Sequence, residues 1–123
     1  MSIRVLICGD RYWQDKASIR KVIDSLPPGA TVIHGAAPGA DSIAWDCAVE
    51  RRLTVLTFPA QWSEYGKAAG RIRNQQMLDE GRPDRVVWFH PNLSQSRGTR
   101  DMLERARKAN IPTSDGMWWT YSD

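Results

Sequence analysis

The sequence predicts a single α/β domain of Rossmann-like type, with three layers and a mostly parallel sheet of about five strands. Two observations predict this fold. Short apolar strands alternate with amphipathic helices along all 123 residues, and small residues stand where strands give way to helices. A chain of this length can bury one core without metal or disulfide support. We therefore expect one domain over residues 1–123.

An apolar run predicts the first strand, and apolar residues at helical spacing predict the first helix. Residues 3–8 are almost continuously apolar and end at Gly9, a pattern typical of a strand buried on both faces of a parallel sheet. From Asp15 onward, apolar residues recur at helical spacing until Pro27 ends the pattern. This stretch predicts an amphipathic crossover helix.

The same unit recurs along the rest of the chain. Strands are expected over residues 31–34, 53–58 and 85–89, and the helices that follow them end at residue 51, span 66–80 and span 99–110. Residues 111–113 predict a short last strand. In parallel folds built from such right-handed units, ligands bind at the carboxyl ends of the strands.

Charge and composition narrow the classes of partner. The net charge of +3, from 17 Lys and Arg against 14 Asp and Glu, favours anionic ligands without singling out nucleic acid. No apolar run is long enough to cross a bilayer, so we expect a cytoplasmic protein with no membrane partner. Cys8 and Cys47 fall in a predicted strand and helix, as buried thiols do. Because no Cys or second His clusters with His34, we expect no metal site and no cofactor.

The first candidate site segment stands at the end of the first strand and reads Gly9-Asp10-Arg11-Tyr12-Trp13. Gly9 lets the backbone approach a ligand, the Arg11 guanidinium matches a phosphate, and Trp13 can stack on a base. The alternative is a turn in which Asp10 and Arg11 are solvated and Trp13 caps the core.

The second segment is the loop of small residues from His34 to Asp41. Gly35, Gly39 and Ala40 expose backbone N–H groups where a helix begins, which favours an anion. Asp41 would repel a phosphate in direct contact, so we expect it to accept hydrogen bonds from ribose hydroxyls, to cap the helix, or both. His34 is a candidate general base, and its alternative is a hydrogen-bonded structural residue.

The third segment, residues 65–74, is expected to present donors from a helix. Helical spacing aligns Gly66 with Arg73, and a stripe of small residues permits close approach. Lys67, Arg71 and Asn74 lie on a neighbouring, more polar face that can meet an anion. The alternative is a solvated basic face.

The fourth segment, Ser96-Arg97-Gly98-Thr99, is a loop that leads into the last helix. Backbone N–H groups and the Thr99 hydroxyl make this another potential anion site. Basic and acidic residues alternate after it, so an ordinary charged helix is the alternative.

Taken together, these four segments resemble the YspA-like branch of the SLOG superfamily, which also contains the Smf/DNA-processing proteins and the Lonely Guy phosphoribohydrolases. The similarity spans nearly the whole chain. It implies a Rossmann-like fold, a pocket for nucleotides or ADP-ribose-type ligands, and a homodimer. Lonely Guy enzymes carry a catalytic Glu in the motif Pro-Gly-Gly-x-Gly-Thr-x-x-Glu, and here Met102 stands at that position. The resemblance therefore supplies no catalytic residue.

The leading hypothesis is a module that binds a phosphorylated, nucleotide-like small molecule, in the manner of a sensor. Arg11, Lys67 and Arg73 are expected to converge on its phosphates, and Trp13 or Tyr65 to stack on its base. The full set of expected ligand contacts is Gly9, Asp10, Arg11, Trp13, His34, Gly35, Gly39, Ala40, Asp41, Tyr65, Gly66, Lys67, Arg73, Asn74, Gly98 and Thr99.

Two other functions stay open. One is an N-glycosidic hydrolase of nucleoside monophosphates, in which Asp10 or Asp41 replaces the missing Glu in assisting water attack. The other, less favoured, is a nucleic-acid-binding module like the Smf relatives. Such a module would need a continuous basic stripe, whereas the charges here are scattered along the sequence.

Overall fold

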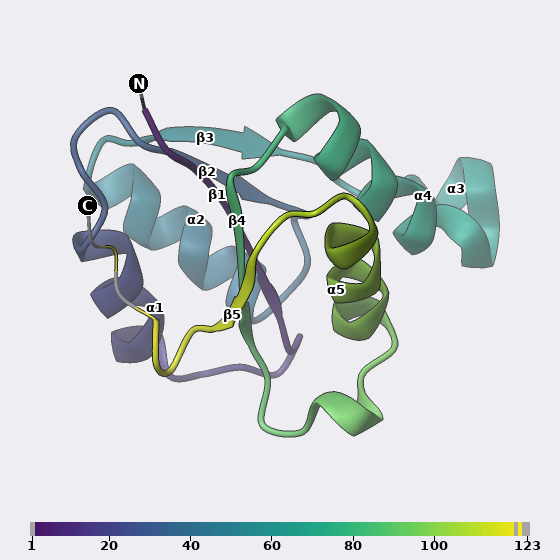
Figure 1. Ribbon diagram of the computed structural model, residues 1–123. Coiled ribbons are helices and arrows are strands. Elements are labelled where there is room, and N and C mark those ends of the chain that lie inside the picture. Colours follow the sequence, from purple (N-terminus) through teal and green to yellow (C-terminus); the bar gives the residue numbers. More distant parts are fainter. Residues whose placement is uncertain (1, 120, 122–123) are drawn as a thin grey trace.

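The computed structural model of the chain describes residues 2–119 and residue 121 (Figure 1). Five parallel strands form one sheet in the order β3-β2-β1-β4-β5. The strands are β1 (Arg4–Gly9), β2 (Thr31–His34), β3 (Thr54–Thr57), β4 (Arg85–Phe89) and β5 (Thr113–Asp115). The expected Rossmann-like α/β fold is thereby confirmed.

Helices cover both faces of this sheet. The longer helices are α1 (Lys16–Asp24), α2 (Ala40–Glu50), α4 (Ala69–Gln76) and α5 (Gly98–Lys108). The shorter helical segments are α3 (Trp62–Tyr65), η1 (Gly66–Ala68), η2 (Met77–Gly81) and η3 (Leu93–Gln95). In Figure 1, α1 and α2 lie together on one side of the strands, and α5 lies on the other.

The central strand β1 explains this three-layer arrangement. Val5 and Ile7 belong to the core shared with α1 and α2, whereas Leu6 and Cys8 belong to the core shared with η2 and α5. Successive side chains of a strand point to opposite faces, so a continuous apolar run is what a doubly covered strand needs. Since β1 pairs with both β2 and β4, the order of the strands reverses there. The crevice at such a reversal is where ligands of open α/β sheets bind.

The structure departs from the expected elements in two places. The helix expected over residues 66–80 is divided among η1, α4 and η2, and the short helix α3 precedes it. Gly66 ends α3 with a φ of 57°, which a continuous helix cannot contain. The last strand begins at Thr113 rather than residue 111, because Pro112 has no N–H and contributes only its carbonyl oxygen, 2.9 Å from the Val86 nitrogen.

The aromatic residues near the carboxyl terminus differ in their surroundings. Trp119 and Tyr121 pack against the core on the α1 and α2 side, while Trp118 is 86% exposed. Thr120, which belongs to the same aromatic tail, lies outside the described residues. Within the described part of the chain, no helix has the length and apolar character needed to span a membrane.

Candidate functional site

The first and second candidate segments pack against each other at the carboxyl ends of β1 and β2. The Asp10 amide donates to the Phe89 carbonyl (2.8 Å), and the Asp10 carbonyl accepts from the Ala40 amide (3.1 Å). Gly39 has a φ of 75°, and a Cβ at this position would clash with backbone atoms of Asp10 and Arg11. The start of α2 therefore lies directly on the loop that follows β1.

Gly35 joins the second segment to the third. Its amide donates to the Asp41 carboxylate (2.8 Å), and its carbonyl accepts a hydrogen bond from Arg73. The guanidinium also occupies the space that a Cβ on Gly35 would need. A second donor, the Ala37 amide, lies 3.4 Å from the Asp41 carboxylate. The loop between β2 and α2 is thus held from inside by Asp41 and from α4 by Arg73.

Burial dominates the electrostatics of this loop. It raises the pKa of Asp41 to about 6, against the opposing effects of the Gly35 amide and the Arg73 charge. It also lowers the pKa of Arg73, although a guanidinium stays protonated at any physiological pH. Asp41 is only 5% exposed, so its carboxylate accepts hydrogen bonds from backbone amides of the loop rather than from solvent.

His34 takes the structural role that was its alternative to a general base. Its Nδ1 accepts from the Ala36 amide (3.0 Å), so in the neutral ring Nε2 carries the proton and donates to the Thr57 hydroxyl (2.9 Å). Burial and the Arg73 charge lower the pKa of His34 to about 4. The ring is therefore neutral at pH 7, and both nitrogens are engaged.

Asn74 joins the third segment to the fourth. Its side-chain oxygen accepts from Arg73 Nε (3.1 Å), and its amide nitrogen donates to the Gly98 carbonyl (3.3 Å) and the Asp101 carboxylate (3.0 Å). Asn74 is buried, so these bonds fix α4 relative to the first turn of α5. All four sequence segments therefore meet along the carboxyl edge of the sheet.

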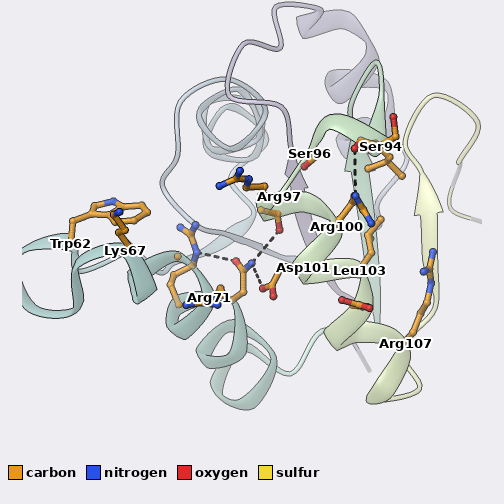
Figure 2. Close-up of a pocket in the computed structure, with 16 residues that line it drawn as sticks. Trp62, Lys67, Arg71, Ser94, Ser96, Arg97, Arg100, Asp101, Leu103 and Arg107 are labelled. Carbon is orange, nitrogen blue, oxygen red and sulfur yellow. Dashed lines mark hydrogen bonds between the residues drawn. The ribbon is translucent and has the colours of Figure 1, made fainter.

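A groove of about 1080 Å³ opens between the two helical walls that Asn74 connects. One wall consists of α3, η1 and α4, and the other of η3, the loop after it and α5 (Figure 2). The lining residues are Trp62, Lys67, Gly70, Arg71, Arg73, Asn74, Leu93, Ser94, Ser96, Arg97, Gly98, Arg100, Asp101, Leu103, Glu104 and Arg107.

The groove is strongly basic. Six lining side chains are cationic and two, Asp101 and Glu104, are anionic, so its positive excess is larger than the +3 of the whole chain. Among the described residues, none of the six cations forms a salt bridge. Figure 2 shows Lys67 and Arg71 on one wall and Arg97 and Arg100 on the other. The charge that looks scattered in the sequence is gathered here.

The groove contains only part of the expected ligand-binding set. Lys67, Arg73, Asn74 and Gly98 line it. Twelve expected residues are not among the residues that line it, and these are Gly9, Asp10, Arg11, Trp13, His34, Gly35, Gly39, Ala40, Asp41, Tyr65, Gly66 and Thr99. Most of them belong to the packed loops behind the groove. Asp10 and Asp41, the two carboxylates considered for assisting water attack, are among the residues that do not line the groove.

Arg11 and Trp13 illustrate why these residues stay out of the groove. The Arg11 guanidinium lies 5.5 Å from the centre of the exposed Tyr12 ring, and Arg11 is not among the residues that line the groove. The Trp13 ring packs at 5.6 Å on the buried Phe89, and its N–H donates to Asp15 and Ser18. Trp13 thus caps the core, which was the alternative to base stacking.

Several groove residues were not identified from the sequence. Trp62 belongs to the unexpected helix α3. Arg100 and Arg107 lie where interleaved charges indicated an ordinary charged helix, whereas Arg97 belongs to the fourth candidate segment but was not expected to contact the ligand. Their spacing of three and seven residues does place the three arginines on one face of a helix. That one-sided spacing was the signal that could have identified them.

Comparisons with known proteins place this geometry in a family. A model of the YspA, cpYpsA-related SLOG family matches residues 3–65, from β1 through α3. The gene 61 protein of Mycobacterium phage D29 is 38% identical over 118 aligned positions, which cover 89% of this chain and 92% of that protein.

A solved structure shows the same fold in a longer chain. The X-ray structure of DNA processing protein A (DprA) from Streptococcus pneumoniae superimposes with a TM-score of 0.74 at 17% identity. The match covers 94% of this chain and 53% of that one, so this chain spans about half the length of DprA. At this identity the likeness concerns the fold alone, whereas the family model and the phage relative define the membership. The chain belongs to the YspA, cpYpsA-related SLOG family.

Proposed function

We propose that this protein binds a nucleotide or a nucleotide-derived, ADP-ribose-like ligand in the basic groove between α4 and α5. The observation that carries the proposal is the set of six groove cations, none of which is neutralised by a salt bridge within the described residues. Unpaired cations on facing walls attract an anion that lies between them. The guanidinium group of arginine in particular can donate two parallel hydrogen bonds to the oxygens of a phosphate.

The rest of the lining fits the other parts of a nucleotide. Trp62 is 60% exposed at the α3 end of the groove, where its ring offers a stacking surface for a base. Leu93 adds apolar surface on the opposite wall. A volume of about 1080 Å³ is at the upper end for small-molecule sites, so a ligand with two phosphates and more than one ring can be accommodated.

Isothermal titration of the purified chain tests the proposal with four probes: inorganic phosphate, AMP, ADP and ADP-ribose. Binding should strengthen with the number of phosphates and weaken as salt is raised, because exposed charges are screened within about 10 Å at 0.1 M salt. A ligand present at 100 times its Kd should also stabilise the fold by about 2.7 kcal/mol in a thermal melt.

Matched charge variants locate the site. Arg97→Gln and Lys67→Ala each remove a groove cation and should weaken ADP binding by about two- to fivefold. Lys21→Ala removes an exposed cation of α1, on the other face of the sheet, and should leave the affinity unchanged. The proposal is wrong if folded protein binds none of the four probes, or if Lys21→Ala weakens binding as much as the groove variants.

Single-stranded nucleic acid is a second candidate, favoured by the combination of cations on both walls with the exposed ring of Trp62. Proteins that bind single strands combine such a charged groove with stacking aromatic side chains. An oligonucleotide would neutralise several cations at once, so its affinity should fall far more steeply with salt than that of ADP. If ADP displaces the oligonucleotide, both occupy the same groove.

A further inference from the structure

Asp101 is a carboxylate held in the middle of a cationic groove. It lies on the first turn of α5, and its side chain is 22% exposed. One carboxylate oxygen, Oδ2, accepts from Asn74 Nδ2 (3.0 Å) and from Arg105 Nε (2.8 Å). Among the described residues, no donor contacts the other oxygen, Oδ1. The carboxylate is therefore fixed in orientation while keeping one acceptor for a ligand.

The other carboxylates of the region do not offer such an acceptor. Asp41 is buried behind the groove and is engaged by the Gly35 and Ala37 amides. Glu104 lines the groove but is exposed, and no salt bridge or hydrogen bond within the described residues orients its side chain. Fixing a mobile side chain costs conformational entropy, so Glu104 is the weaker acceptor. Asp101 alone combines exposure to the groove with a fixed orientation.

The chemistry of an ionised carboxylate limits what it can contact. It repels phosphate, and it accepts hydrogen bonds from hydroxyl or amino groups. In a ligand that also carries phosphates for the surrounding cations, the neighbouring hydroxyl donors are those of the ribose. A carboxylate fixed by the protein can accept from a ribose hydroxyl, as the acidic residue of dinucleotide-binding folds does.

We propose that Asp101 accepts a hydrogen bond from the ribose 2′-hydroxyl and makes the groove selective for ribonucleotides over 2′-deoxyribonucleotides. Asn74 and Arg105 act as positioning residues that hold the carboxylate. This inference rests on the proposed function, since it concerns a ligand bound in the same groove.

The test compares each ribonucleoside 5′-diphosphate with its 2′-deoxy counterpart in isothermal titrations. A hydrogen bond to a charged group corresponds to a preference of at least about tenfold, so the wild type should bind the ribonucleotide that much more tightly. Asp101→Asn removes the charge with little change in shape. It should tighten the binding of both ligands, because phosphate repulsion is relieved, and reduce the preference to about twofold or less.

Glu104→Gln is the matched control, because it removes the same charge from the same helix and groove. It should tighten binding but keep the full preference for the ribonucleotide. A thermal melt verifies that each variant is folded, and Arg105→Gln, which loosens Asp101 without removing it, should give an intermediate preference.

The outcomes separate this inference from the proposed function. If inorganic phosphate and the diphosphates bind but the wild type shows no ribose preference, or Asp101→Asn retains it, the role of Asp101 is wrong while the function stands. If no phosphorylated probe binds to the folded wild type, the function fails, and the role of Asp101 is overturned with it.

Discussion

Replacing Gly39 with alanine places a methyl group where the backbone of Asp10 and Arg11 already lies. The φ of 75° at Gly39 is also one that an L side chain rarely adopts. Backbone strain of this kind costs about 1–3 kcal/mol, and forcing extra volume into a packed contact costs about as much again. Gly39→Ala should therefore lower the free energy of unfolding by about 2–6 kcal/mol.

Gly29 provides the matched control for this substitution. Its φ of 86° is similarly positive, but a Cβ there would meet no atom within 4 Å. Gly29→Ala should therefore cost only the strain, about 1–3 kcal/mol. Urea denaturation at pH 7 measures both variants against the wild type. If Gly39→Ala is no less stable than Gly29→Ala, the close packing of the first two segments is refuted.

Three further predictions concern the links between the site segments. Burial raises the pKa of Asp41 from 3.8 to about 6, so protonated Asp41 stabilises the fold. This contribution is complete below pH 4 and is lost as pH rises through 6. Urea titrations from pH 4 to 7 should show the free energy of unfolding of the wild type falling by about 2 kcal/mol relative to that of Asp41→Asn, whereas the same pH dependence in both proteins would contradict the burial argument. The opposite effect of His34, whose pKa is lowered to about 4, is present in both proteins and cancels. Asn74→Ala removes the bonds between α4 and α5 and should lower the free energy of unfolding by about 2 kcal/mol in urea titrations, and an unchanged midpoint would show that those bonds do not hold the walls together. Trp62→Ala should weaken ADP binding about tenfold in calorimetry but leave inorganic phosphate unaffected, and an equal loss for both would exclude base stacking.

The fold could be predicted from the sequence because each strand is marked by a local pattern of apolar residues. Residues 3–8 are apolar on both faces, and the structure buries Val5 and Ile7 on one side and Leu6 on the other. The break at Gly66 was less visible, because the surrounding residues favour a helix and only the positive φ of that glycine interrupts it.

The site could be predicted only in part, because its position depends on which loops pack and which stay open. Gly9, Gly35 and Gly39 were expected to admit a ligand, but the groups that lie against them are the protein's own Phe89 carbonyl, Arg73 guanidinium and Asp10 backbone. A small residue indicates a close neighbour without identifying it.

The basic face of α5 was not predicted, for a related reason. Acidic residues are interleaved with the basic ones along α5, so the segment resembles any solvated helix, and only its packing beside α4 makes one face of it the wall of a groove. Arg97 and Arg100 form one basic groove only together with Lys67 and Arg71 on the other wall. Such facing pairs are separated by about 30 residues and depend on tertiary structure.

The most direct test of the account is a crystal structure of the chain soaked with ADP-ribose at saturating concentration. We expect the two phosphates to lie between the walls of the groove, within hydrogen-bond distance of Arg71 or Lys67 on one side and Arg97 or Arg100 on the other. Phosphates bound instead at Arg11 and the loop after β1, or on the face covered by α1 and α2, would contradict it.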